Sequence, residues 1–401
     1  MNPLFETLPT SIFETMSLAA TKHGAVNLGQ GFPDFGWPEP LLAEAARLLR
    51  DGSNQYAPSR GLPVLRQAIV DHYARHHGAD LTPNQVLVTS GATEAIAAAI
   101  LAIVSEGDEV IVMTPAYDAY APLVRRAGGV VREVALQPPE WRIDPAALQD
   151  VVTPRTKLLI LNNPHNPTGR LFTRAELQAV ADLAERNDLL VLSDEVWEHV
   201  LLKVPPTQGE VAAQRTEGSG VTAHFIPFAS LPNMAARTLK TGSGGKIFAL
   251  TGWKVGWLVA PPELASIVAK AHQFLTFATA TALQAAVAWG LNEGDSWLPP
   301  MQAAFRHGRD RLADGLAQHG FVLLPSEATY FACVDLEASG IQQDDMTFAM
   351  QAVEQAGIAV IPLSPFAEAD PPCRFVRLCF AKQDSTLDAG IAAMARTREL
   401  S

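Results

Sequence analysis

Short apolar runs alternate with helical patterns between about residues 85 and 260 of this chain. Amphipathic or alanine-rich stretches at 93–104, 117–127 and 173–186 predict helices. Thr173 and Glu176 have the spacing of a capping box, which marks a helix start. The intervening runs are largely apolar and bounded by turn or capping residues, so we expect buried strands at 86–88, 109–112, 157–161 and 189–192.

This alternation predicts an α/β fold with a mainly parallel central sheet covered by helices. Parallel strands need crossover connections, and helices supply both the crossovers and the cover for the sheet. In open sheets of this kind, ligands bind beyond the carboxyl ends of the strands. Candidate chemistry is therefore expected in the residues that directly follow each apolar run.

The pattern changes near residue 296, which predicts a second, smaller α+β domain. A long helical pattern covers 297–319 and another helix is expected near 345–356, with apolar runs at 321–324, 330–334 and 374–380. Residues 203–223 contain two Pro, three Gly and no hydrophobic period, which indicates an exposed loop insertion. We expect an N-terminal segment (1–45) that packs with the small domain, a large domain (46–295) and the small C-terminal domain (296–401).

Composition narrows the class of protein. The chain has 401 residues, and a hydrophobic fraction of 48% excludes a disordered chain. Its 42 acidic and 30 basic residues leave a net charge of −12, which argues against nucleic acid as a partner. Three cysteines predict no disulfide framework and suit a reducing cytoplasm. No signal peptide or membrane span is expected, because no Lys or Arg precedes Lys22 and the longest apolar run, 95–104, is short.

Residues 89–95, Thr-Ser-Gly-Ala-Thr-Glu-Ala, follow the first strand and open a helix. Backbone N–H groups at a helix start, with small residues and hydroxyls around them, can hold a phosphate. An ordinary capped helix explains the same residues, so this segment alone leaves both interpretations open.

Residues 162–169, Asn-Asn-Pro-His-Asn-Pro-Thr-Gly, follow the third expected strand. Two Asn-Pro pairs impose extended or turn geometry and end the strand. Such a loop would hold the Asn166 amide in one orientation at the ligand end of the sheet. A structural turn is the plainer explanation, and His165 is read as a loop residue.

Asp194 follows the fourth strand, where an acid could bind a metal, a ribose hydroxyl or a cationic ring. We expect no metal there, because no His, Asp or Glu set with ligand spacing lies nearby. A dinucleotide is also not expected, because no strand here is followed by Gly-x-Gly-x-x-Gly.

A glycine-rich run at 241–256 contains Lys246. It is not a P-loop, since Lys240 stands where the first Gly is required and Ile247 replaces the Ser or Thr. A lysine with a lowered pKa can form a Schiff base with a ligand. A solvated loop lysine is the alternative.

Together, a phosphate cradle, an acid for a ring nitrogen, a fixed amide and a reactive lysine describe a site for pyridoxal 5′-phosphate. At this point the chain resembles the class I aminotransferases of fold type I. It looks most like the group of kynurenine aminotransferase and glutamine transaminase K, with bacterial methionine aminotransferases. The resemblance runs from about Phe5 to Leu387, and its motifs are NLGQGFPDF (27–35), NQYAPSRG (54–61), NNPHNPTG (162–169), SDEV (193–196), GSGGK (242–246), TGWKVGW (251–257) and RLCFAK (377–382).

The resemblance implies roles for individual residues. Lys246 matches the lysine joined covalently to the cofactor, which later carries the proton of the substrate. Asp194 matches the carboxylate that pairs with the ring nitrogen, and Asn166 matches the amide that binds the ring oxygen and lies near the substrate. Tyr117 matches the ring stacked on the cofactor. The phosphate would be held by the backbone of Ala92 and Thr93, by Ser243 and by Lys254.

The substrate residues are implied in the same way. Arg377 matches the arginine that clamps the α-carboxylate, while Gly31 would contribute backbone contact and Phe13 would line the pocket. Family members are homodimers that share their active sites. Tyr56 would therefore reach the phosphate of the partner chain, and Phe277 would line the pocket of the partner.

The chain departs from the family pattern at two places. Trp197 stands where a tyrosine commonly binds the ring oxygen, and an indole N–H can only donate. Asp194 and Lys246 are also separated by more residues than is usual, which agrees with a loop insertion at 203–223.

We therefore predict a cytoplasmic aminotransferase for large neutral or aromatic amino acids of the methionine, glutamine, phenylalanine or kynurenine type. An acidic donor such as aspartate should be poor, because we identify no second arginine for its side chain. Three alternatives stay open: a cysteine-conjugate β-lyase using the same cofactor site, a ligand-sensing domain of a transcription regulator, and a catalytically inactive scaffold. The sensing domain would need a helix-turn-helix, which residues 1–40 do not supply.

Overall fold

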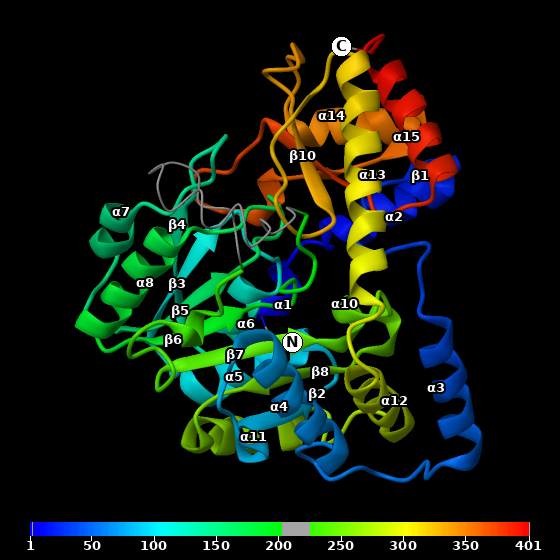
Figure 1. Ribbon diagram of the computed structural model, residues 1–401. Coiled ribbons are helices and arrows are strands. Elements are labelled where there is room, and N and C mark those ends of the chain that lie inside the picture. The colour runs from blue at the N-terminus through cyan, green and yellow to red at the C-terminus, as the bar shows by residue number, and fades with distance from the viewer. Residues whose placement is uncertain (2, 203–224, 401) are drawn as a thin grey trace, which may run out of the picture.

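A seven-stranded sheet forms the middle of the larger part of the molecule (Figure 1). The computed structural model describes residues 1, 3–202 and 225–400, so the insertion predicted at 203–223 lies outside the described residues. The strands follow the order β2 (Val86–Thr89), β8 (Gly256–Val259), β7 (Thr238–Ser243), β6 (Leu190–Asp194), β5 (Thr156–Asn162), β3 (Glu109–Thr114) and β4 (Val130–Ala135). β8 runs antiparallel to both neighbours and the remaining pairs are parallel. The predicted α/β fold with a mainly parallel sheet is confirmed.

Alternate residues of the strands face different helices, which explains why the strand sequences are apolar throughout. Val110 and Val112 pack in a core with α5 (Ala92–Ile103), α6 (Tyr120–Arg126) and α11 (Pro262–Leu275). Ile111 belongs to another core, which includes residues of α8 (Arg174–Arg186) and α7 (Pro145–Asp150). At the β2 edge, a third core joins α3 (Glu39–Asp51), α4 (Pro63–His77) and α12 (Thr281–Asn292). A sheet buried on both faces needs apolar residues at every position.

The four expected strands are present as β2, β3, β5 and β6, but β4, β7 and β8 were not predicted. β7 was not predicted because its sequence, TLKTGS, is largely polar. Every residue of this strand is nevertheless buried. Its Lys240 is compensated by the carboxylates of Glu195 and Glu198, at 2.9 and 2.7 Å. A strand of this kind has no apolar signature, since its polar groups find their partners only in the folded chain.

Helix boundaries follow local capping chemistry. The predicted capping box opens α8, where the side chain of Thr173 accepts from the N–H of Glu176. The helix expected over 117–127 begins only at Tyr120, which leaves Tyr117 in the loop after β3. The helix expected near 345–356 consists of α14 (Asp345–Gln351) and a π-helical turn, η4 (Ala352–Ala356).

The C-terminal part contains an antiparallel sheet of β12 (Ile361–Pro362), β13 (Phe375–Cys379), β10 (Phe331–Asp335) and β9 (Val322–Leu323). α13 (Leu298–Gln318) runs from the larger part into this one and packs against α15 (Asp384–Thr397) (Figure 1). α2 (Ile12–His23) contacts β11 (Ile358–Ala359), which pairs with β1 (Val26–Asn27). The N-terminal chain thus lies against the C-terminal elements.

The remaining elements are short. They are α1 (Pro3–Thr7), α10 (Gly244–Ile247) and the 3₁₀ turns η1 (Pro83–Gln85), η2 (Phe228–Ser230), η3 (Thr251–Trp253) and η5 (Ser364–Phe366). Within the described ranges, no helix is both long and apolar enough to cross a membrane.

Candidate active site

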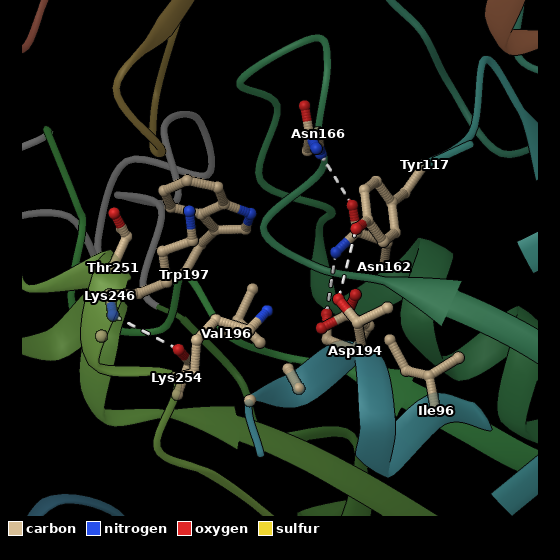
Figure 2. Close-up of a pocket in the computed structure, with 15 residues that line it drawn as sticks. Ile96, Tyr117, Asn162, Asn166, Asp194, Val196, Trp197, Lys246, Thr251 and Lys254 are labelled. Atoms are coloured by element: carbon tan, nitrogen blue, oxygen red, sulfur yellow. Dashed lines mark hydrogen bonds between the residues drawn. The ribbon is translucent and has the colours of Figure 1, made fainter. Parts of the chain in front are cut away.

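A cavity of about 210 Å³ lies at the carboxyl ends of β5 and β6, beside the start of α5 (Figure 2). This is the edge of the sheet at which the sequence predicted the chemistry. The predicted site residues that line it are Ala92, Thr93, Tyr117, Asn166, Asp194, Ser243, Lys246 and Lys254. Residues from segments more than 150 positions apart along the chain therefore share one cavity.

Close backbone packing shapes one end of this cavity. Gly91 has a φ of +83° just before α5, a conformation that favours glycine. A Cβ on Gly256 would lie 2.6 Å from the backbone nitrogen of Ala92, so only glycine lets β8 approach this helix start. Lys254 brings its Nζ to 3.2 Å from the position that a Cβ of Gly91 would occupy. The N–H groups at the start of α5 and the ammonium of Lys254 therefore lie close together. Such a combination of groups binds anions.

Asp194 is almost completely buried and is held by hydrogen bonds on both carboxylate oxygens. The phenol of Tyr120 donates to Oδ2 at 2.6 Å, and the hydroxyl of Thr241 donates to Oδ1 at 2.9 Å. Burial raises the pKa of this carboxyl, while the two hydroxyl groups oppose the shift. The result is a fixed acid at the wall of the cavity.

The loop after β5 is locked to the strand end that carries Asp194. The amide of Asn162 donates to the backbone oxygen of Asp194 at 2.9 Å, and its side-chain oxygen accepts from the N–H of Asn166 at 2.7 Å. Figure 2 shows this chain of contacts along one side of the cavity. The Asn166 side chain in turn accepts from Arg377 at 2.9 Å, so its orientation is set from two directions.

Lys246 lies on the other side of the cavity, between two aromatic rings. Its Nζ is 4.4 Å from the ring centre of Trp197 and donates to the hydroxyl of Tyr330 at 2.9 Å. The Tyr330 hydroxyl donates to the backbone oxygen of Gly31 at 2.7 Å, which leaves its lone pairs for the lysine. Burial lowers the pKa of Lys246 to about 8, and the nearby charge of Arg377 adds to this shift.

Arg377 is 1% exposed and sits above the same region on β13. Its guanidinium donates to two neutral oxygens, on Asn166 and on the backbone of Gly29, each at 2.9 Å. It also stacks on Phe331, at 3.9 Å, and lies 5.0 Å from the ring centre of Phe13. Its Nε has no hydrogen-bond partner among the described residues. A buried cation of this kind is suited to an anionic ligand.

The predicted residues that do not line this cavity are Phe13, Gly31, Arg377, Tyr56 and Phe277, and the last two lie on the exposed surface. Tyr56 and Phe277 contact each other edge to face, with ring centres 5.6 Å apart. Tyr56 is 88% exposed and Phe277 is 42% exposed. Within one chain they are neighbours of each other rather than of the cavity.

Sequence reasoning did not single out Tyr120, Thr241 and Tyr330, although each touches a central side chain. Tyr120 opens a helix, Thr241 lies on the polar strand β7, and Tyr330 precedes β10. Their contacts span separations of 74, 47 and 84 residues. The only sequence signal was the place of Thr241 within the glycine-rich run.

Residues 23–394 match the sequence profile of the family described as aminotransferase class I and II. The chain is 40% identical to the methionine aminotransferase of Escherichia coli strain K12, over 98% of this chain and 96% of the relative. It is also 40% identical to the protein named "Probable N-succinyldiaminopimelate aminotransferase DapC" of Mycobacterium tuberculosis, over 96% of each chain. Kynurenine–oxoglutarate transaminase 1 of Rattus norvegicus is 33% identical over 94% of this chain and 93% of its own.

Solved structures agree with these relatives. The N-succinyldiaminopimelate aminotransferase of M. tuberculosis superposes with a TM-score of 0.91 at 40% identity, over 99% of both chains.

Proposed function

The chain belongs to the class I and II aminotransferases, and from this premise we propose that its amino donor is a large neutral or aromatic amino acid. Enzymes of this family depend on pyridoxal 5′-phosphate and share its fold type I, so the chain is an aminotransferase that uses this cofactor. The two relatives at 40% identity are named for different substrates, methionine and N-succinyldiaminopimelate. The choice of donor therefore has to rest on the site.

The residues of the cavity fit this cofactor. Glycines 91 and 256 leave room at the start of α5 that a Cβ would fill, and Ala92, Thr93, Ser243 and Lys254 would hold the phosphate there. Asp194 would face the ring nitrogen and Asn166 the ring oxygen, with Tyr117 stacked on the ring. When bound, the cofactor supplies an aldehyde for amines and a ring that accepts the electron pair left by the α-proton.

The protein residues position the substrate and move its proton. Arg377 binds the α-carboxylate, and its buried guanidinium with an unpaired Nε supports this role. Lys246, with a pKa lowered to about 8, exchanges a proton at Nζ near neutral pH far more readily than an exposed lysine. Asp194, held by Tyr120 and Thr241, would lie opposite the ring nitrogen of the bound cofactor, where a carboxylate stabilises the charge that develops during the reaction.

The observation that carries the choice of donor is the charge around the expected side-chain pocket. A cavity of about 610 Å³ adjoins Tyr117 and is lined by Asp118, Ser11, Phe366 and Arg125 among others. Asp118 is an acid that accepts from Ser11 at 3.0 Å, and Arg125 is already paired with Glu368. A substrate carboxylate placed here would face Asp118, and the described residues that line the cavity offer it no cation other than the paired Arg125, which is costly in a partly buried site. A neutral side chain meets aromatic and aliphatic walls instead.

The active sites are shared between two chains of a homodimer. The exposure of Tyr56 and Phe277, together with Phe274, which is 85% exposed, supports this arrangement. Large exposed aromatic side chains that lie close together are typical of a surface covered by a partner. In the proposed dimer, Tyr56 would contact the phosphate of the partner's cofactor and Phe277 would line the partner's pocket.

The substrate proposal is tested by the loss of the visible absorbance of the holoenzyme when single amino acids are added. We expect the second-order rate constant of this absorbance loss to be about 100-fold higher with methionine than with aspartate. The aspartate side chain would lose its hydration in the pocket without gaining a partner. Glutamine, phenylalanine, kynurenine and N-succinyldiaminopimelate complete the panel. Pyruvate and ammonia release from a cysteine conjugate measures the β-lyase alternative in parallel.

Asp118→Asn is the matched variant for this panel. Removing the carboxylate should raise the rate constant for aspartate, so that it comes closer to that for methionine. The rate constant for methionine should stay nearly unchanged. Equal rates for the two donors in the unaltered enzyme, or a preference for N-succinyldiaminopimelate, would exclude the proposed donor class. β-Elimination faster than transfer would favour the lyase.

Tyr330 gives a separate prediction, as a positioning residue for Lys246. Tyr330→Phe removes the acceptor of the lysine N–H and leaves the ring in place, so we expect kcat to fall about tenfold with little change in KM. The hydroxyl also stabilises the charged form of Lys246, and its loss should lower the pKa of this lysine. The acidic limb of the pH profile of kcat should therefore move to lower pH.

Tyr73→Phe is the control for Tyr330→Phe. Tyr73 is equally buried, but its hydroxyl bonds to Glu198 and Trp257 rather than to the cavity. This variant should unfold more easily without shifting the pH profile. An unshifted profile in Tyr330→Phe would show that its hydroxyl does not position the lysine.

A further inference from the structure

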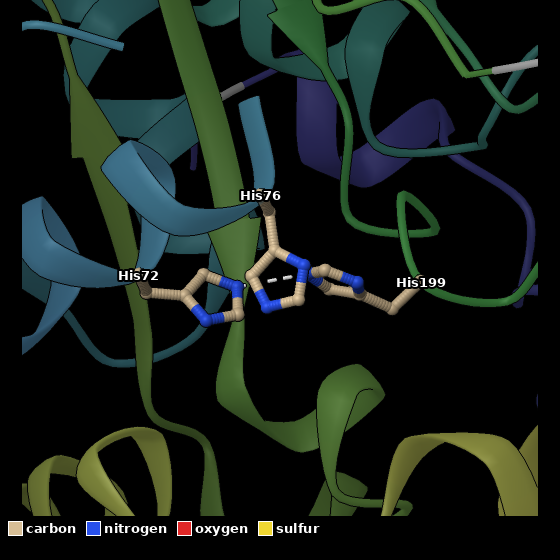
Figure 3. A group of neighbouring side chains, drawn as sticks. All are labelled: His72, His76 and His199. Carbon is tan, nitrogen blue, oxygen red and sulfur yellow. Dashed lines mark hydrogen bonds between the residues drawn. The ribbon is translucent and has the colours of Figure 1, made fainter. Parts of the chain in front are cut away.

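Three histidines, from α4 and from the segment that follows β6, lie close together outside the candidate active site. His72 and His76 lie four residues apart on α4, and His199 lies five residues after Asp194 (Figure 3). One potential ligand atom from each residue lies within 4.8 Å of the others. None of the three lines the candidate active site.

The rings face one another closely. Nε2 of His72 and Nε2 of His199 are 2.8 Å apart. The ring centre of His76 is 4.3 Å from that of His72 and 4.8 Å from that of His199. Figure 3 shows the three imidazoles directed toward a common point from two different segments. Residues four apart on a helix project from the same face, so α4 supplies two of the groups together.

Two of the three rings are buried away from solvent. His72 is fully buried and His199 is 5% exposed. A neutral imidazole has a free lone pair, which is the form that binds a metal ion.

Hydrogen bonding within the protein leaves this cluster incompletely satisfied. His72 Nδ1 is buried and has no partner among the described residues. Two imidazole Nε2 atoms can share only one proton in their contact, so one of the two rings must act as acceptor. Hydrogen bonds among the rings alone therefore do not use all the nitrogens that the cluster brings together.

Neighbouring groups have the arrangement that supports metal-binding histidines. Asp295 Oδ1 lies 3.0 Å from His76 Nε2, so this nitrogen is engaged and Nδ1 is the one left for a metal. A carboxylate on the far nitrogen of a ligand ring orients it and raises its basicity. The side chain of Gln302 donates to the backbone oxygen of His199 at 2.9 Å, which fixes the third histidine.

We propose that His72, His76 and His199 bind one divalent transition-metal ion of the zinc type. In a tetrahedral zinc site, nitrogens at the usual bond length are about 3.3 Å apart. The measured separations, from 2.8 Å up to 4.8 Å, bracket that value, so small side-chain rotations bring the three nitrogens to bonding distance. Water completes the coordination, while Asp295 stays on the far nitrogen of His76.

The ion has a structural role, because it joins α4 to the segment that follows β6 and carries the wall residue Trp197. His199 is two residues beyond Trp197, whose ring contacts Lys246. By holding this segment against α4, the ion restricts the motion of Trp197 in the cavity wall. The ion itself does not contact the substrate. The site is therefore independent of the identity of the amino donor.

The sequence shows no His, Asp or Glu set with ligand spacing near Asp194, and the expectation of no metal at that acid stays a prediction. His72 and His199 are 127 residues apart along the chain, so no local spacing connects them. The His-x-x-x-His pair on α4 was visible in the sequence, but nothing local indicated that a third histidine would join it.

The test is zinc binding by the purified holoenzyme prepared without a histidine tag. After treatment with a chelator, Zn²⁺ is titrated in competition with a chromophoric chelator, and the bound metal is measured by mass spectrometry. We expect one Zn²⁺ per chain and a higher thermal unfolding temperature on binding. His76→Gln and His199→Gln should each weaken binding at least tenfold, and Asp295→Asn about tenfold.

His307→Gln is the matched control. His307 also contacts a carboxylate, that of Asp384 at 2.9 Å, but its side chain is 60% exposed and it is not part of the group formed by His72, His76 and His199. It should leave zinc affinity unchanged. Failure of the unaltered protein to bind Zn²⁺ in the competition assay overturns the proposal, and this measurement needs no variant to fold. Binding that survives both His76→Gln and His199→Gln overturns it as well.

Discussion

Lys246→Ala is expected to abolish amino transfer, with a fall in kcat/KM of about 10⁴-fold, at the upper end of what proton transfer by one side chain contributes. Lys246 is the lysine that extends between Trp197 and Tyr330, and burial lowers its pKa to about 8. Alanine removes the amine that binds the cofactor and also the group that moves the proton of the substrate. The measurement is amino transfer from methionine to a 2-oxo acid, with the absorbance spectrum of each protein.

The spectrum separates this result from simple unfolding. A folded Lys246→Ala protein should still bind the cofactor through its phosphate, but the absorbance change on adding methionine should be lost. Lys270→Ala, which alters an exposed lysine on α11, should behave like the unaltered enzyme. Normal turnover by Lys246→Ala would show that another residue performs the reaction.

Asp194→Asn is expected to lower kcat by about 10²–10³-fold, the usual effect of removing one charge-stabilising group. Asparagine has nearly the same shape and can still accept from Thr241 or Tyr120, so the fold should survive. What is lost is the negative charge opposite the ring nitrogen. The measurements are kcat for methionine and the affinity of the protein for the cofactor.

Asp188→Asn is the corresponding control, because Asp188 is an exposed acid whose side chain is 96% accessible and pairs with Arg237. Its kinetic constants should equal those of the unaltered enzyme. If Asp194→Asn kept its rate within a few fold, the acid would not face the ring nitrogen, and the proposed orientation of the cofactor would be wrong.

Much of the large sheet could be predicted from local patterns. Buried parallel strands need apolar residues on both faces, so β2, β3, β5 and β6 are visible as apolar runs. The motifs after these strands are equally local, since a loop that ends a strand and shapes a ligand site must use specific residues. Asp194 was found in this way, whereas Lys246 was found through the glycine-rich run that contains it.

Other parts of the site have no local signature. Tyr120 and Tyr330 are ordinary aromatic residues in the sequence, and only the packing of α6 and β10 brings their hydroxyl groups to Asp194 and Lys246. β7 was missed for a similar reason. Its Lys240 looks solvent-exposed until Glu195 and Glu198 surround it.

By itself, the sequence determined the α/β class, the edge of the sheet that carries the chemistry, the aminotransferase family and its cofactor. These follow from periodicity and from motifs whose residues are close together along the chain. Only the tertiary structure decided which hydroxyl groups hold Asp194 and Lys246, how Asp118 lies beside the pocket, and that three histidines meet behind β6. Contacts of this kind join segments far apart in the sequence, and their energies depend on burial and distance, which no local pattern encodes.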